Sequence, residues 1–389
     1  MARLGDICEK ITDYVASGSF AALKENVLIT NEPNYAIMVK TADFSNGFTK
    51  NLTYTDKRGY DFLHNSNLFG GELILSNIGS IGKVFKVPYL RRPMTLASNT
   101  VMLKTKDDLL TDYLFHFFQS EAGYKKLMSI SSGTSMLKFN KTELKNIDVP
   151  YPDRETQMKT VSNMDKLNHL ISLRKKQLQK LDDLVKSRFV EMFGDTKSNP
   201  FGFERRPLRE TCTVITGNTP SRSVPEYYGD SIEWIKTDNI VAGQLNPSQA
   251  IEYLSDEGAR VGRTVDDGAI LMACIAGSVA SIGRVCITDR KVAFNQQINA
   301  ILPKDYDSLF LHAMLQLSKE YLVEEVNMAL KGILSKSKLE SKEFIVPPMN
   351  QQKEFAAFVT RVDKSKLTVQ QGLDKLELLK QSLMQKYFG

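Results

Sequence analysis

One short phrase occurs twice in this chain, and the repeat to which it belongs limits what the chain can fold into. Residues 79–84 read GSIGKV and residues 280–285 read ASIGRV. The likeness continues on both sides of the phrase, at an offset of about 195 to 204 residues. A chain of 389 residues also exceeds what one hydrophobic core usually supports. The sequence therefore predicts two copies of one folding unit in tandem. Further matching segments are LGDICEKIT (4–12) with LRETCTVIT (208–216), VKTADFSNG (39–47) with IKTDNIVAG (235–243), IDVPYP (147–152) with FIVPPM (344–349), and KLDDLVKSRFVEMFG (180–194) with KLELLKQSLMQKYFG (375–389).

Each copy changes in character along its length. The first part reads as short β runs broken by Gly, Asn and Pro, with helical segments near 109–128 and 308–329, which predicts a mixed α/β (α+β) domain. Near 154–193 and 350–388 glycine and proline almost vanish and helix formers dominate, so each copy should end in a long helix, with Gly194 and Gly389 as its C-terminal caps. The predicted boundaries are a first domain at 1–152, a long helix at 153–194, a linker at 195–207, a second domain at 208–348 and a second long helix at 349–389.

The two long helices carry apolar residues at alternating spacings of three and four, which is typical of a coiled-coil seam. Basic residues interrupt the seam at Arg174, Arg188, Lys366 and Lys380. The simpler alternative is that each helix packs only on its own domain; the matching patterns favour helices that pack on each other. Leu170, Leu184 and Phe189 are expected on the exposed flanks. The predicted seam residues are Met164, Leu167, Ile171, Leu178, Leu181 and Val185 in the first helix, and Val359, Val362, Val369, Leu373, Leu376 and Leu383 in the second.

The lengths of the helix and of the linker indicate the direction of packing. A helix of about 38 residues is roughly 57 Å long, whereas the segment 194–207 spans about 45 Å even when fully extended. The chain therefore cannot return to the start of the first helix before the second domain begins. The expected arrangement is an antiparallel helix pair that separates two related α/β domains, a dumbbell with pseudo-twofold symmetry.

Motifs for catalysis and for metal binding were sought and not found. NIGSIGK resembles a phosphate loop, but Asn77 stands where that loop needs glycine and Val84 follows Lys83. The sequence also lacks GxGxxG, HExxH and GxSxG motifs, and its four histidines are scattered without metal-ligand spacing. Its four cysteines show no CxxC spacing, which is typical of a reduced, intracellular protein. These absences predict a protein that binds without catalysing a reaction. Two alternatives stay open: a self-contained DNA methyltransferase or nuclease with unrecognised catalytic residues, and a coiled-coil scaffold.

Hydropathy favours a cytoplasmic protein, and the charge permits an anionic partner. The net charge of +6 permits nucleic acid binding without requiring it. The N-terminal stretch has charges where a signal peptide needs an apolar run, and the apolar stretch 269–282 is too short to span a bilayer. No membrane association is expected.

Two similar domains on a rigid connection suit a long ligand with its own twofold symmetry, and duplex DNA is such a ligand. Lys, Arg, Ser and Thr hold phosphates, and Arg, Lys, Asn and Gln read bases. Each candidate taken alone is more typical of a solvated surface; clusters that recur in both halves favour DNA contact. Lys83 and Arg284, in the repeated phrase, are either scaffold around turns at Gly82 and Gly283 or phosphate contacts. The candidates are Lys40, Lys83, Arg91, Arg92, Ser135, Lys138, Asn140 and Lys141 in the first half, and Thr219, Arg222, Lys236, Arg284, Gln296, Gln297, Lys331, Lys336 and Lys338 in the second.

The second half carries a specific set of phrases in order: ITGNTPSRSVPEYYGDSIEWIKTDNI (215–240), GSVASIGRV, FNQQINAI and IVPPMNQQKEF. The first half carries a weaker version, with GGELILSNIGSIGKV and SSGTSMLKFNKTELKNIDVPYP. Over nearly its whole length the chain resembles the specificity subunits of type I restriction-modification systems, with their target recognition domains. The first half departs from the pattern, because KITDYVASGSF lacks the GxTPS loop seen at 217–221.

This resemblance implies a subunit without catalysis of its own. Each target recognition domain is expected to read one half of a split, asymmetric DNA site, and the helices are expected to set the spacer between the halves. The implied partners are double-stranded DNA, two methyltransferase (modification) subunits that dock on the chain, and restriction (motor-nuclease) subunits. No cofactor is expected on this chain; S-adenosylmethionine, ATP and Mg²⁺ are expected in the partners.

Overall fold

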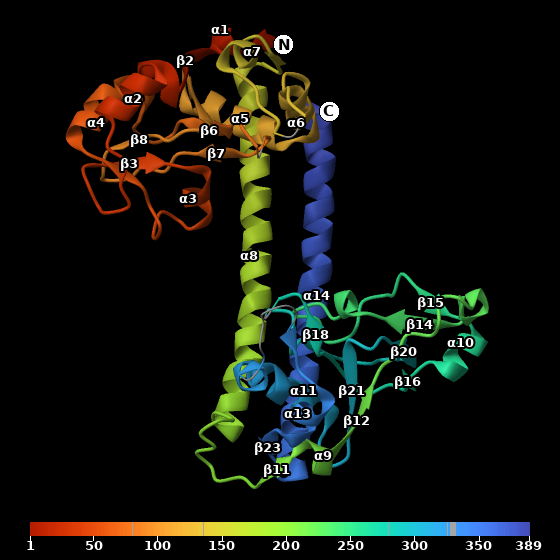
Figure 1. Cartoon of the computed structure of the whole chain (residues 1–389). Coiled ribbons are helices and arrows are strands. Elements are labelled where there is room, and N and C mark those ends of the chain that lie inside the picture. Colours follow the sequence, from red (N-terminus) through yellow and green to blue (C-terminus); the bar gives the residue numbers. More distant parts are fainter. Residues whose placement is uncertain (80, 135, 279, 325, 327–331) are drawn as a thin grey trace. The chain divides into compact units, whose positions relative to one another are not determined.

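The computed structural model describes residues 1–79, 81–134, 136–278, 280–324, 326 and 332–389. The chain divides into two compact units: unit 1 comprises residues 1–173 and 372–389, and unit 2 comprises residues 174–371. Two 40-residue helices, α8 (Arg154–Phe193) and α14 (Met349–Phe388), are each divided between the units. Each unit is therefore an α/β domain together with one end of each long helix (Figure 1).

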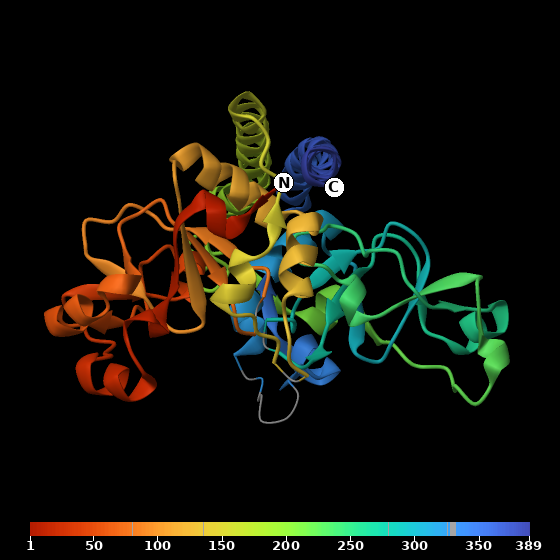
Figure 2. The same cartoon turned by 90° about the horizontal axis from the view of Figure 1, so that it is seen from above.

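Unit 1 is built on two four-stranded sheets. Its elements are β1 (Ala2–Arg3), α1 (Leu4–Ile7), β2 (Cys8–Asp13), α2 (Phe20–Asn26), β3 (Ala36–Val39), α3 (Thr41–Ser45), β4 (Tyr54–Thr55), α4 (Lys57–Phe62), β5 (Asn67–Leu68), β6 (Leu73–Ser76), β7 (Val84–Lys86), β8 (Met94–Leu96), β9 (Thr100–Thr105), α5 (Asp108–Gln119), α6 (Glu121–Ser129), α7 (Lys141–Lys145) and β10 (Asp148–Val149). One sheet has the order β2-β9-β6-β7 and is antiparallel; the other has the order β4-β3-β8-β5, in which β3 and β8 run parallel. β1 pairs with β10. Both chain termini belong to unit 1 and lie close together in both views (Figures 1 and 2).

Unit 2 repeats most of this order and adds the strands β13, β18 and β22. Its elements are β11 (Arg205–Pro207), α9 (Leu208–Thr211), β12 (Cys212–Thr216), β13 (Tyr228–Gly229), β14 (Ile232–Ile235), β15 (Tyr253–Leu254), α10 (Asp256–Val261), β16 (Thr264–Val265), β17 (Ile270–Ala273), β18 (Ile275–Ala276), β19 (Val285–Ile287), β20 (Val292–Phe294), β21 (Ile298–Pro303), α11 (Ser308–Leu317), α12 (Lys319–Val323), β22 (Gly332–Ile333), α13 (Lys336–Ser341) and β23 (Glu343–Ile345). The sheet β12-β21-β17-β19 matches β2-β9-β6-β7, and β15-β14-β20-β16, extended by β13, matches β4-β3-β8-β5. The predicted fold class, two mixed α/β domains in tandem, is confirmed.

The repeated phrase lies in the connection between equivalent strands of the two units, and in unit 2 this connection also contains β18. It connects β6 to β7 in unit 1 and β17 to β19 in unit 2, and both strand pairs are antiparallel. Gly82 has φ +89° and Gly283 has φ +74°, a left-handed backbone that favours glycine. At Gly82 an added Cβ would also lie 2.4 Å from the Tyr124 ring. The structure therefore confirms that these two glycines turn a strand pair.

In unit 1 the start of α8 packs against the end of α14. Met164 on α8 lies in one buried core with Met384 and Phe388 on α14. The Asn163 side-chain amide donates a hydrogen bond to the Tyr387 hydroxyl at 2.7 Å. The Phe388 ring also lies 5.4 Å from the ring of Tyr113 on α5, so the helix ends are part of the domain core.

In unit 2 the end of α8 packs against the start of α14. Phe189 and Phe193 on α8 surround Phe355 on α14, at ring distances of 5.4 and 5.7 Å. Two ion pairs connect the same segments: Arg188 with Glu354 at 2.9 Å and Lys366 with Asp182 at 2.6 Å. Start meets end in unit 1 and end meets start in unit 2, so within each unit the paired segments run antiparallel.

The helix surface agrees in part with the expected pattern. Every predicted seam residue is buried or half-buried, and their assignment to one coiled-coil seam stays a prediction. Leu170 and Leu184 are exposed, as expected for the flanks. The expectation for Phe189 was wrong: its side chain is 1% exposed, because α11 encloses this end of α8 and places Phe310 5.5 Å from the Phe189 ring. Gly194 ends α8 with φ +73°.

We expect Phe189→Ala to destabilise unit 2 by about 3 to 5 kcal/mol, because it leaves a cavity among aromatic rings that cannot collapse to fill it. Val190→Ala on the same helix is the control, since Val190 is 46% exposed and its loss should change the free energy of unfolding by less than about 0.5 kcal/mol. Denaturant unfolding of the two variants measures the difference. Equal effects would contradict the packing described here.

Candidate nucleic-acid interface

Two of the candidate cations in unit 2 share one carboxylate. Arg222 Nη2 lies 2.6 Å from Glu252 Oε2, and Lys236 Nζ is paired with Glu252 Oε1. Beneath them lie aromatic rings: the Arg222 guanidinium is 4.9 Å from the centroid of Tyr228 and 5.6 Å from that of Trp234, and Lys236 Nζ is 4.9 Å from that of Trp234. Cations over aromatic faces are attracted by the ring quadrupole. We call Arg222, Tyr228, Trp234, Lys236 and Glu252 the Glu252 cluster.

Strand pairing explains why these side chains meet. Lys236 directly follows β14, and Glu252 directly precedes β15. The two strands are antiparallel, and the Trp234 amide donates to the Glu252 carbonyl at 3.0 Å. Two residues 16 positions apart are thereby held on adjacent strands.

The loop that carries Arg222 is held to the same sheet. The Tyr228 hydroxyl donates to the Pro220 carbonyl at 2.7 Å, and the Trp234 indole donates to the Asn218 carbonyl at 3.4 Å. At Gly217 an added Cβ would lie 2.1 Å from the Asn295 carbonyl oxygen, so only glycine allows this approach. The GNTPS phrase is therefore a scaffold that positions the side chains following it.

Electrostatics keep the cluster charged. Hydrogen bonds from Lys236 and then from Arg222 lower the pKa of Glu252. The hydrogen bond with Glu252 raises the pKa of Arg222. Both shifts favour the charged forms of Glu252 and Arg222, and the formal charges of the three side chains sum to about +1.

Beside the Glu252 cluster lies a second polar group. The Thr219 hydroxyl donates to the Gln296 side-chain oxygen, and both residues are exposed. Gln297 is half-buried, and its side-chain oxygen accepts from Asn295 at 3.3 Å. Thr219 and Gln296 thus present polar groups to solvent next to Arg222, whereas Gln297 is engaged inside the turn.

Unit 1 has a related arrangement at the equivalent strand ends. Lys40 directly follows β3 and donates from Nζ to the Thr53 hydroxyl at 2.7 Å, and Thr53 directly precedes β4. Arg92 is exposed, lies 4.8 Å from the Tyr54 ring centroid and donates to the Asn34 carbonyl. Lys40 and Thr53 therefore occupy the places of Lys236 and Glu252. Successive side chains of a strand point to opposite faces, so Arg92 on Tyr54 is not the counterpart of Arg222 beside Glu252.

The other candidates are dispersed over the two units. Arg91 and Lys83 are exposed, and Lys83 lies with Tyr124 at a shallow depression of about 520 Å³. Lys138 is exposed, and its backbone bridges to Ser132 and Ile78. Arg284 is half-buried and donates to the Ala280 carbonyl at 3.2 Å; the exposed Lys336 lies 3.6 Å from Glu340, and Lys338 is exposed on α13. Ser135 and Lys331 lie outside the described residues.

Two candidates in unit 1 have structural partners. Asn140 caps α7: its side-chain oxygen accepts from the amides of Thr142 and Glu143, both at 2.9 Å. Lys141 pairs with Asp13 at 3.0 Å. These contacts stabilise the start of the helix, so Asn140 has a structural function that the list of DNA contacts had overlooked.

Three members of the Glu252 cluster were absent from the candidate list: Tyr228, Trp234 and Glu252. Trp234 had a detectable signal, because it is the only tryptophan and stands two positions before Lys236, on the same face of a strand. Glu252 had none in the local sequence, since its partners are reached only through strand pairing.

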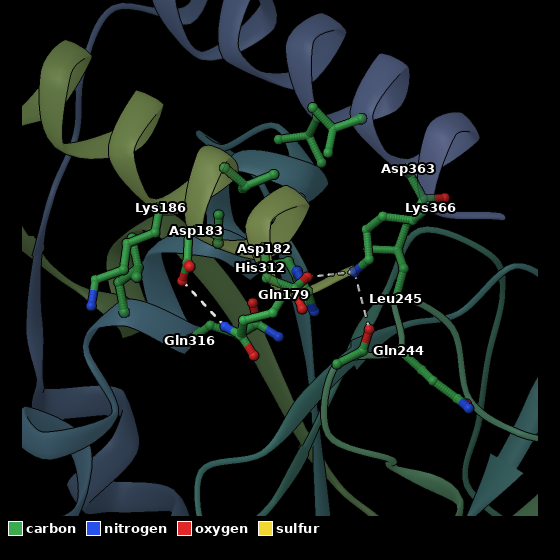
Figure 3. Close-up of a pocket in the computed structure, with 16 residues that line it drawn as sticks. Gln179, Asp182, Asp183, Lys186, Gln244, Leu245, His312, Gln316, Asp363 and Lys366 are labelled. Carbon is green, nitrogen blue, oxygen red and sulfur yellow. Dashed lines mark hydrogen bonds and ion pairs between the residues drawn. The ribbon is translucent and has the colours of Figure 1, made fainter. Parts of the chain in front are cut away.

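A polar pocket of about 390 Å³ lies in unit 2 between α8, α11, α14 and residues 243–245 (Figure 3). Lys366 crosses it and bonds to Asp182 and, at 3.2 Å, to the Gly243 carbonyl. Within the described part of the chain no group of three or more His, Cys, Asp or Glu residues could hold a metal ion. The four cysteines are buried, and burial raises the pKa of each thiol to about 12, so they are poor nucleophiles.

His312 lines this pocket with an Nε2 atom that lacks a hydrogen-bond partner in the described structure. Its pKa is lowered from 6.5 to about 4, mainly by burial and also by the nearby charge of Lys366, while a hydrogen bond with the Val285 backbone opposes the shift. Between pH 6.5 and about 4 the His312 ring is therefore mostly neutral in the folded chain, whereas it is mostly protonated in the unfolded chain.

We expect the free energy of unfolding of unit 2 to fall as the pH falls from 6.5 to about 4, because the unfolded state binds the additional proton in that window. The loss through this one ring is at most about 3 kcal/mol. Denaturant unfolding between pH 7 and 4.5 should show a flatter profile for His312→Gln than for the unsubstituted chain. Parallel profiles would contradict this assignment.

A chain that presents two related cationic surfaces on two copies of one α/β domain belongs to the class of paired-domain binding proteins. A family model described as the type I restriction modification DNA specificity domain matches residues 1–183 and 200–378. The chain belongs to this family and is a DNA-recognition subunit of a type I restriction-modification system. Recognition is its function in such a system, and the family is not catalytic.

Relatives and solved structures agree with this assignment. The chain is 23% identical over 341 residues to the type I restriction enzyme MjaIX specificity subunit of Methanocaldococcus jannaschii, covering 81% of this chain and 76% of the relative. It is 34% identical over 120 residues to the HindI specificity subunit of Haemophilus influenzae, covering 30% of this chain and 25% of the relative. The fold is similar to that of the S subunit from M. genitalium, with a TM-score of 0.60 and 12% identity over 100% of this chain and 95% of that one. No helix among the described residues is long and apolar enough to cross a membrane.

Proposed function

We propose that each α/β domain reads one half of a split DNA site, and that the Glu252 cluster in unit 2 and Lys40 with Arg92 in unit 1 contact the DNA. The observation that carries the proposal is the duplicated lysine: in each domain a lysine that follows one strand is held by the side chain that precedes the neighbouring strand. Paired cations held in fixed positions suit phosphates, and the exposed Thr219 and Gln296 suit base edges or phosphates.

The domain ranges at 1–152 and 208–348 are proposed as the target recognition domains, and 153–194 and 349–389 as the spacer helices. Two methyltransferase subunits would dock on the chain, and restriction subunits would complete the complex. S-adenosylmethionine, ATP and Mg²⁺ would then be bound by those subunits, in the cytoplasm, while this chain contacts the DNA. The exposed Leu170 and Leu184 on α8 support a docking surface for a partner subunit.

The two long helices are proposed to set the spacer between the half-sites. The antiparallel pairing found within each unit supports this function, because matched insertions in both helices would then lengthen one connection. A helix of 40 residues is roughly 60 Å long, which is comparable with a small number of helical turns of DNA at about 34 to 36 Å each.

We expect the double substitution Arg222→Ala and Lys236→Ala to weaken binding to duplex DNA and to reduce the slope of log K against log salt by roughly 1 to 2. Both effects are expected because the double variant loses up to two contacts with DNA phosphates. Titration of the full chain with labelled duplex at several salt concentrations measures both. Arg209→Ala, an exposed arginine on α9, is the control for loss of positive charge and should leave the slope nearly unchanged. An unchanged slope in the double variant would exclude this surface.

We expect the insertion of seven residues into both helices, after Lys175 and after Gln370, to lengthen the DNA spacer. Seven helical residues add about 10.5 Å, which corresponds to roughly three base pairs at about 3.4 Å each, and a seven-residue insertion preserves the seam pattern. Mapping methylated bases in cells that contain the partner subunits measures the spacer. Seven residues inserted into the linker at 195–207 should leave it unchanged. An unaltered spacer after the matched insertions would refute the role as a ruler.

A further inference from the structure

We propose that Glu252 restrains Arg222 and Lys236 so that DNA of non-matching sequence binds weakly, which makes Glu252 a specificity-determining residue of the second domain. The inference rests on the proposed function, because it assumes that the two cations contact DNA. It adds a negatively charged residue to that cationic surface. The function assigned to this residue is discrimination against non-matching DNA, which attractive contacts alone do not provide.

The geometry makes the restraint mutual. Arg222 binds one oxygen of the Glu252 carboxylate and Lys236 binds the other, so one anion occupies a donor of both cations. A phosphate that approaches either cation must displace a carboxylate oxygen, and it then lies beside a negative charge. Like charges at this separation oppose binding. Without Glu252 the same surface would present two cations and a charge of about +2 instead of about +1.

The ion pairs are weak enough for an approaching DNA phosphate to separate Arg222 and Lys236 from Glu252. The side chains of Arg222, Lys236 and Glu252 are 60%, 32% and 35% exposed, so solvent screens their attraction and phosphates can reach them. Exposed ion pairs usually contribute little to stability. A non-matching duplex binds through its phosphates and has to displace the carboxylate from both cations, whereas in the matching complex base contacts hold the duplex in a position that leaves Glu252 paired; the cost therefore falls on the non-matching duplex. The ratio of the two affinities therefore rises.

Unit 1 supplies the comparison within the same chain. At the equivalent position Thr53 holds Lys40 through a neutral hydroxyl, at 2.7 Å. The lysine side chain is held by a neutral hydroxyl in the first domain and by a carboxylate in the second, although in the first domain Asp43 accepts from the backbone amide of Lys40 at 2.7 Å. Positioning alone therefore does not require a carboxylate, and the charge of Glu252 needs a separate explanation.

Full-length Glu252→Gln tests the proposal, because glutamine keeps a hydrogen-bond acceptor and removes the charge. The probes are one duplex that contains the sequence methylated in the source genome and one duplex of equal length that lacks it. We expect the affinity for the non-matching duplex to rise about five- to tenfold at 0.1 M salt and its salt slope to steepen by roughly 0.9, as one more counterion is released. Affinity for the matching duplex should rise less, so that the ratio falls. Glu226→Gln, an exposed glutamate in the same domain, controls for net charge and should leave the ratio unchanged.

Thr53→Glu is the reverse substitution in the first domain. It should lower the affinity for the non-matching duplex by a similar factor. This variant still tests the proposal if Glu252→Gln does not fold. Equal behaviour of Glu252→Gln and Glu226→Gln would overturn the proposal. It would also be overturned if Glu252→Gln weakened binding to both duplexes equally, because Glu252 would then only hold its loop in place. If the double variant lacking Arg222 and Lys236 binds DNA with an unchanged salt slope, the proposed surface itself fails. If that variant loses binding while Glu252→Gln changes nothing, the surface stands and only the restraint is wrong.

Discussion

The packing of aromatic side chains between the long helices and the domains is the interaction on which the rest of this structure depends. In unit 2, Phe189 and Phe193 of α8 and Phe355 of α14 join Phe310 of α11 in one buried cluster. In unit 1, Phe388 of α14 packs on rings of α5. The helix ends are thus part of each domain core, and the direction in which each helix leaves its domain is fixed by the contacts that stabilise that domain. A connection of this kind suits the proposed spacer function, which a flexible linker would not serve.

Duplication explains how one fold can hold two different surfaces. The strand orders of the two units match, and so do their capped helices: Asp107 caps α5 and Asp307 caps α11, each through its side-chain oxygen. The loops and strand ends differ between the copies. Glu252 in the second domain replaces the hydroxyl of Thr53 in the first. Since the buried strands need only apolar residues of suitable shape, the surface can diverge while the core is retained.

Much of the fold follows from the sequence, because internal repeats and helix-forming runs extend over many residues. The site was harder to predict. Phe189 was misplaced because helical periodicity indicates one apolar face and cannot show that α11 covers a second face of the same helix end. The capping function of Asn140 could have been found, since Glu143 three residues later completes a capping box. Glu252 meets Lys236 only because two strands pair, and no local spacing encodes that contact.

The charged interruptions of the helix seam are best understood by comparing magnitudes. Within unit 2, the pairs Arg188–Glu354 and Lys366–Asp182 are partly exposed, and each contributes about 0 to 1 kcal/mol. Loss of one buried ring such as Phe355 costs about 3 to 5 kcal/mol. The aromatic cluster therefore provides most of the stability, and the ion pairs mainly select the register. An apolar seam alone would tolerate a shift by one heptad, but such a shift would separate both ion pairs and withdraw Phe355 from its pocket. The proposed spacer function needs a helix register that cannot slip, and within unit 2 these contacts provide it.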